Sequence, residues 1–160
     1  MNIRVRCWTA SLLWCAGLWG QSVSLSTISS QDGSSGSILL KLDSPAGKVP
    51  VALQWNFSLP PGMTVEPSDL NAGSAAESAD KTLTCAASNP KPPGGGTIYR
   101  CILYGGEKPI SNGTVATVLY RVAKNSARSS DKISARNVLG VSADTKPIPM
   151  ADVEITLLSK

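Results

Sequence analysis

A strict alternation of apolar and polar residues between Val51 and Leu59 constrains this fold more than any other feature of the sequence. The odd positions hold Val51, Leu53, Trp55, Phe57 and Leu59, whereas the even positions hold small or polar residues. A repeat of two indicates a β-strand with one buried face, because successive side chains of a strand point to opposite sides. Pro60-Pro61-Gly62 then ends the strand, since proline cannot donate a ladder hydrogen bond and glycine favours a turn.

The same alternation recurs later in the chain, at Thr114–Val122 and Val153–Leu157. Ala116, Val118, Tyr120 and Val122 share one face of the first of these two segments. Less regular strands are expected at Val23–Ile28, Ile38–Leu42, Leu83–Ala86, Ile98–Tyr104 and Ile133–Val141.

Turn-rich stretches separate these strands, at Gln31–Ser37, Asn71–Asp80, Asn89–Thr97, Gly105–Gly113 and Asp144–Pro149. No segment has a convincing helical period, although Ala75–Ala79 is long enough for a single turn. We therefore predict an all-β fold, in which about eight or nine strands form two antiparallel sheets packed face to face.

The first residues have the proportions of an export signal. Arg4 and Arg6 precede an apolar run of about a dozen residues, which is shorter than the roughly 20 that a bilayer-spanning helix needs. Gly20-Gln21-Ser22 satisfies the small-x-small rule for cleavage after Ser22. We predict a signal peptide at residues 1–22 and a single domain at residues 23–160. The mature protein would be extracellular or periplasmic, without stable insertion in a membrane.

Two other interpretations of this segment stay open. One is a buried helix that belongs to the fold. The other is a lipoprotein signal built on Cys15, against which the bulky Trp14 counts, because lipidation signals have a small residue before the cysteine.

Composition excludes several kinds of chemistry. The chain of 160 residues contains no histidine, so neither a Ser-His-Asp or Cys-His nucleophile system nor a His-ligated metal site is available. Its formal charge of +4 falls to +2 without Arg4 and Arg6, and the charges are scattered, which argues against a nucleic-acid partner. The aspartates do not form a calcium-binding loop of the EF-hand kind. We therefore expect no cofactor and no resident metal, although a calcium site built from distant loops would not be visible in the sequence.

Two cysteines remain in the mature chain, Cys85 and Cys101, and they enclose 15 residues. An exported compartment permits disulfides, and both cysteines fall on strands expected to be neighbours. We predict a structural disulfide between them. A redox-active pair is disfavoured by the spacing, and reduced buried thiols are the remaining alternative.

The order of four motifs resembles cohesin domains and related carbohydrate-binding β-sandwich modules. The motifs are VPVALQWNFSLPPGMTV (Val49–Val65), YRCILYG (Tyr99–Gly105), ISNGTVATVLYRVA (Ile110–Ala123) and SARNVLGVSADTKPIPMADVEITL (Ser134–Leu157). The resemblance spans most of residues 23–158 and implies a secreted bacterial jelly-roll sandwich of about nine strands. Cohesins are non-catalytic and bind dockerin modules through one sheet face, gathering polysaccharide-degrading enzymes on a scaffold. No dockerin-contacting residues can be carried over position by position.

The resemblance favours a non-enzymatic recognition module that binds a dockerin-type protein in extracellular polysaccharide degradation or surface assembly. Arg100, Tyr104 and Arg121 are the candidate binding-face residues, although charges on a sheet face also serve to keep it soluble. Direct carbohydrate binding is the alternative. Trp55 could stack on a sugar ring, but its place between Leu53 and Phe57 in the strand pattern favours the core.

A hydrolase with paired carboxylates is a third hypothesis. Its candidates are Glu66, Glu77, Glu107 and Glu154, and nothing in their local sequence distinguishes them.

Overall fold

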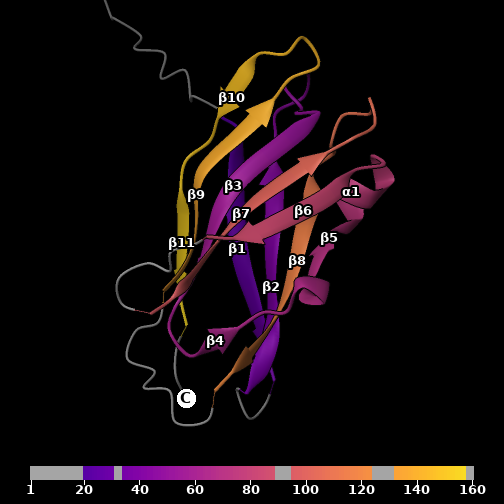
Figure 1. Cartoon of the computed structure of the whole chain (residues 1–160). Coiled ribbons are helices and arrows are strands. Elements are labelled where there is room, and N and C mark those ends of the chain that lie inside the picture. The colour runs from indigo at the N-terminus through magenta and orange to yellow at the C-terminus, as the bar shows by residue number, and fades with distance from the viewer. Residues whose placement is uncertain (1–19, 31–33, 89–94, 124–131, 158–160) are drawn as a thin grey trace, which may run out of the picture.

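The computed structural model describes residues 20–30, 34–88, 95–123 and 132–157 (Figure 1). Most of the predicted signal peptide, with Cys7, Cys15 and the basic start, lies outside these ranges, so the signal peptide stays a prediction. None of the helices in the described ranges is both long and apolar enough to cross a membrane.

The strands form two antiparallel sheets, which confirms the predicted fold class. Sheet A has the order β1-β2-β8, and β4 and β5 both pair with the other edge of β8. Its strands are β1 (Ser22–Ser29), β2 (Ser35–Asp43), β4 (Met63–Thr64), β5 (Leu70–Ala72) and β8 (Gly113–Val122).

Sheet B has the order β10-β9-β3-β7-β6, and β11 pairs with β9 beside β10. Its strands are β3 (Ala52–Leu59), β6 (Thr82–Ala87), β7 (Thr97–Tyr104), β9 (Lys132–Val141), β10 (Pro147–Pro149) and β11 (Val153–Thr156). A 3-10 turn, η1 (Pro67–Asp69), and a short helix, α1 (Ser74–Ser78), lie between β4 and β6.

The core lies between the sheets and is built by the alternation seen in the sequence. Leu53, Trp55, Phe57 and Leu59 are all buried, and Trp55 is only 3% exposed, so it packs in the core as predicted. Ala116, Val118 and Tyr120 of β8 face them from sheet A. Each long strand therefore has one apolar face inside, because burial of that surface is the main favourable term in folding.

The predicted disulfide is confirmed. Cys85 of β6 and Cys101 of β7 lie directly opposite each other in register, with their Cα atoms 4.1 Å apart. Both face the core, and Cys101 is fully buried. β6 is hydrogen-bonded to β7 at the edge of sheet B, and the disulfide adds a covalent link between the same two strands.

Three very short strands were not predicted. The stretch Asp144–Pro149, expected as a turn, contains β10, and its prolines are tolerated because β10 lies at the edge of sheet B. The stretch Asn71–Asp80 contains part of β5 and the single turn of helix, which begins at Ser74. β4 follows the Pro60-Pro61-Gly62 turn directly and pairs with the end of β8.

The two sheets approach each other along both sides of the sandwich. On one side β1 of sheet A lies beside β11 of sheet B, and on the other β5 lies beside β6 (Figure 1). The two sheets thus approach a flattened barrel.

Candidate functional site

The outer face of sheet B brings two of the predicted binding residues together. Arg100 and Tyr104 lie on β7 with Ile102 between them, and all three side chains point to solvent. Ile102 is 43% exposed and Tyr104 is 48% exposed. The side chains that alternate with them face the core, as the period of two requires.

The strand register extends this row across the sheet. Ile102 lies between Thr84 of β6 and Gln54 of β3, and Gln54 in turn lies opposite Leu139 of β9. Arg100 lies between Ala86 and Asn56, and Asn56 lies opposite Arg136. We call this surface the sheet B face, defined by Gln54, Asn56, Thr82, Thr84, Ala86, Arg100, Ile102, Tyr104, Arg136 and Leu139.

A bulge in β9 shapes one side of the sheet B face. Arg136 pairs with Asn56 and Leu139 with Gln54, so β9 has an extra residue at this point. Asn137 has a positive φ of 53° there, and its backbone N–H donates to the Asp152 carboxylate at 2.7 Å. The bulge lets residues three positions apart, Arg136 and Leu139, share one face, because the extra residue resets the alternation.

Charges on the sheet B face are unevenly paired. Glu154 of β11 accepts from Lys132 at 2.9 Å and from Arg136 at 3.3 Å. The hydrogen bond from Lys132, helped by Arg136, lowers the pKa of Glu154. Arg100, in contrast, forms no ion pair within the described residues. Its solvated guanidinium lies beside an apolar row and is therefore available to a partner.

Beyond Tyr104, a buried lysine fixes the loop that continues from β7. Lys81 is buried, and its Nζ donates to the carbonyl oxygens of Gly105 at 2.5 Å and of Gly106 at 2.8 Å. Burial lowers the pKa of Lys81. Lys108 in the same loop forms a 2.6 Å ion pair with Asp80, and this hydrogen bond lowers the pKa of Asp80. The loop is therefore held at a defined position next to Tyr104.

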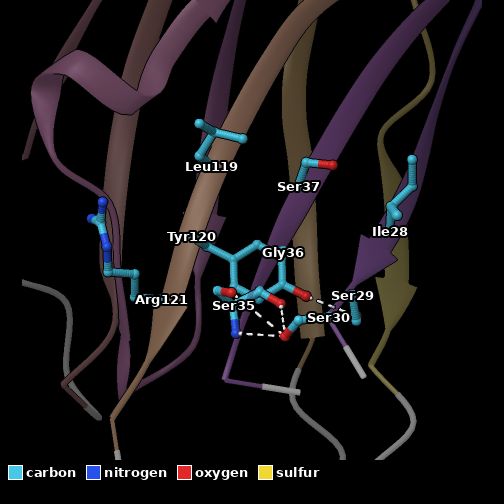
Figure 2. A pocket seen from close by; sticks show the side chains of 9 residues that line it. All are labelled: Ile28, Ser29, Ser30, Ser35, Gly36, Ser37, Leu119, Tyr120 and Arg121. Atoms are coloured by element: carbon cyan, nitrogen blue, oxygen red, sulfur yellow. Dashed lines mark hydrogen bonds between the residues drawn. The ribbon is translucent and has the colours of Figure 1, made fainter. Parts of the chain in front are cut away.

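The third predicted residue, Arg121, lies on the other sheet. It belongs to β8 and lines a shallow depression of about 500 Å³ on sheet A, with residues of β1 and β2 opposite it (Figure 2). The lining residues are Ile28, Ser29, Ser30, Ser35, Gly36, Ser37, Leu119, Tyr120 and Arg121. Arg121 thus shares no surface with Arg100 and Tyr104.

Polar groups in this depression are largely bonded to the protein itself. Arg121 donates to the mostly buried carboxylate of Asp69 at 2.8 Å. Tyr120 shares a 2.9 Å hydrogen bond with the Ser29 hydroxyl, and its ring lies over Gly36, where a Cβ atom would come within 2.5 Å of the tyrosine oxygen (Figure 2). These contacts support the fold at the end of sheet A.

Sequence reasoning missed Ile102, Arg136 and Leu139 as members of the sheet B face. The signal for Ile102 was present, since it lies midway between Arg100 and Tyr104 in a strand of period two. Arg136 and Leu139 depend on the bulge at Asn137 and on pairing with β3, which the local sequence does not reveal.

No group of three or more metal-ligating side chains gathers anywhere in the part of the chain that the structure describes. The lining of the sheet A depression, as far as it is described, includes no carboxylate.

Comparison with known proteins identifies the fold. No family model and no curated protein sequence matches the chain. Among solved structures, a non-cellulosomal cohesin from the archaeon Archaeoglobus fulgidus matches with a TM-score of 0.65 at 15% identity, over 88% of this chain and 92% of that one.

Two further matches are cohesins solved together with a dockerin. The OlpA cohesin complex from Clostridium thermocellum matches with a TM-score of 0.65 at 12% identity, over 87% of this chain and 99% of that one. The third ScaC cohesin of Acetivibrio cellulolyticus, in complex with the ScaB dockerin, matches with a TM-score of 0.64 at 19% identity, over 87% and 99% of the two chains. The chain therefore has a cohesin-like β-sandwich fold.

Proposed function

We propose that this protein is an exported, non-catalytic recognition module that binds a dockerin-type protein partner through the sheet B face. Its role would lie in extracellular polysaccharide degradation or in surface assembly. The cohesin-like fold supports this proposal, because several of the matched structures are described as cohesin–dockerin complexes.

The single observation that carries the proposal is the composition of the sheet B face. It combines exposed Ile102 and Tyr104 with Arg100, a charge that no residue in the described ranges pairs. Tyrosine and arginine are enriched among the residues that anchor protein interfaces, and the buried centre of an interface is more apolar than its rim. In the sheet A depression, by contrast, Arg121 and the Tyr120 hydroxyl are already bonded within the fold.

A matched pair of substitutions tests the assignment of the face. Ile102→Ser removes an apolar side chain that is 43% exposed from sheet B, and Leu119→Ser removes one that is 44% exposed from sheet A. Binding of residues 23–160 to a panel of purified dockerin modules would be measured by isothermal titration calorimetry. We expect at least one module to bind, Ile102→Ser to weaken that binding about tenfold, and Leu119→Ser to change it less than about twofold. Equal effects of the two substitutions, or no binding by any module, would contradict the proposal.

Direct carbohydrate binding is the alternative recognition function, and the aromatic side chains do not favour it. In the described ranges Tyr104 is the one exposed aromatic residue, whereas binding to a flat polysaccharide surface uses a strip of several. A polysaccharide array screened with residues 23–160 provides the comparison: a bound glycan, with no dockerin module bound, would replace the proposed function.

Export is part of the same proposal. The buried disulfide fits an oxidising compartment, where such bonds persist. We expect the mature protein, recovered from culture medium or periplasm, to begin at Val23, as read by N-terminal mass spectrometry. A lipid-modified Cys15 at the N-terminus would instead show anchoring to a membrane.

A further inference from the structure

We infer that the partner of the sheet B face is acidic, and that it places a carboxylate between Arg100 and Arg136 next to an apolar contact with Ile102 and Leu139. This inference rests on the proposed function for the kind of partner, and goes beyond it by naming the chemistry that selects among such partners.

The register places the backbones of the two arginines in one row, whereas the Arg136 guanidinium is bonded to Glu154 on the β11 side of β9. Arg100 on β7 and Arg136 on β9 flank Asn56, which lies on β3 between them. Neighbouring strands lie about 4.8 Å apart, so the two arginines start from backbones about 10 Å apart. Arg100 can reach toward a point above Asn56 directly, and Arg136 can reach it by turning away from Glu154, its partner at 3.3 Å. All three side chains offer N–H donors on the same face.

The charge balance of this row is positive. Lys132, Arg136 and Arg100 lie on β9 and β7, and Glu154 is the carboxylate that pairs with the first two. Asp152 adds a second carboxylate beside β9, where it accepts from the Asn137 backbone N–H at 2.7 Å. Three cations against two carboxylates leave a surplus of one positive charge, and Arg100 is the cation without an ion pair in the described part of the chain. A partner's carboxylate would complete this arrangement, since a planar guanidinium fork matches carboxylate geometry.

The apolar row next to the charges defines the rest of the partner. Ile102 and Leu139 each lie close to an arginine of the same strand, and Ile102 is separated from Arg100 by one strand repeat, about 6.8 Å. Side chains three or four positions apart on a helix lie about 5–6 Å apart on one face. An amphipathic helix with an acidic residue one turn away from an apolar residue therefore fits both rows at once.

The experiment uses residues 23–160 with dockerin modules that bind it in calorimetry. Each binding module is compared with a version in which the acidic residues of its exposed helix faces are changed to the corresponding amides. On the other side, Arg100→Glu is compared with the milder Arg100→Gln, and with the control Lys41→Glu. Lys41 is exposed on the outer face of sheet A. Circular dichroism and thermal unfolding verify that each variant is folded.

We expect Arg100→Glu to weaken binding more than about tenfold, Arg100→Gln to weaken it less, and Lys41→Glu to leave it within about twofold. The amide versions of the dockerin modules should bind the unmodified domain more weakly than the original modules do. For these amide versions, Arg100→Glu should cause no further loss of affinity. Affinity should also fall with added salt.

Two results would overturn the inference in distinguishable ways. Binding that is indifferent to Arg100→Glu and to the amide changes would leave the proposed function standing and remove the charge selection. No binding by any module, together with Arg100-dependent binding of polygalacturonate, would remove both and identify the row as a site for an acidic polysaccharide.

Discussion

The two sheets share one core, but the charged residues on their outer faces differ in whether they are paired within the protein. On sheet A, Arg121 is bound to the mostly buried Asp69, and the hydroxyl of Tyr120 is bound to Ser29. On sheet B, Arg100 stands without an ion pair in the described residues beside exposed Ile102 and Tyr104. Exposure of apolar side chains by itself therefore does not identify a binding surface, since both faces expose large apolar side chains. The informative property is whether the polar groups around those side chains are already used by the fold.

The largest loss of stability is expected from a substitution in the core, on which both outer faces depend. Trp55→Ala empties a fully buried site between the sheets and should lower the free energy of unfolding by about 3–5 kcal/mol. Chemical denaturation followed by circular dichroism would measure this loss. Retention of the original midpoint would show that Trp55 does not belong to a shared core.

Removal of the disulfide should affect sheet B more than sheet A. The double substitution Cys85→Ala with Cys101→Ala should cost about 3 kcal/mol, because it frees a closed loop of 15 residues. Hydrogen exchange should rise in β6 and β7 first, while β2 and β8 keep their protection. Uniform loss of protection in both sheets would contradict this expectation. Chemical reduction of the unsubstituted protein is the matched control.

Two arginine substitutions test whether a paired and an unpaired charge contribute differently to stability. Arg121→Ala leaves the Asp69 carboxylate with the Glu66 backbone N–H, at 3.3 Å, as its remaining partner in the described residues, and should destabilise the protein by about 1 kcal/mol, the pair being partly exposed. Arg100→Ala should change stability by less than about 0.5 kcal/mol, since it breaks no side-chain hydrogen bond or ion pair within the described residues. Thermal unfolding of both variants measures the difference, and a larger loss for Arg100→Ala would reverse the assignment of the two faces.

The smallest effect concerns pH and the edge of the sheet B face. Lys132 and Arg136 hold the pKa of Glu154 below its ordinary value of 4.5 in the folded protein. A carboxyl with a lowered pKa in the folded state stabilises above its unfolded pKa, and this contribution is lost as the pH falls through the folded value. Glu154→Gln should therefore lower the unfolding temperature slightly at about pH 7, and the difference should shrink below about pH 4.5. A constant difference across this range would exclude ionisation of Glu154 as its cause.

Much of the fold could be predicted because its long strands carry their own signal. Buried and exposed positions alternate through β3 as the sequence indicated, and Cys85 and Cys101 meet on adjacent strands. The strands β4, β5 and β10 could not be predicted, since two or three residues do not establish a period and their conformation is set by pairing with β8 or β9.

The candidate site was predictable only in part, for the same physical reason. Arg100 and Tyr104 share a face because they lie four residues apart in one strand, which the sequence shows directly. Their separation from Arg121 depends on which sheet each strand joins. Pairing of Arg121 with Asp69 joins residues 52 positions apart, and no local pattern reports such a contact.

The approach of the two sheets along both sides of the sandwich bears on aggregation at high protein concentration. In the described part of the chain β1 lies beside β11 and β5 beside β6, so a segment of the opposite sheet occupies part of the edge to which a second copy could add its own strand. At high protein concentration these neighbours would hinder strand addition between copies at the two edges.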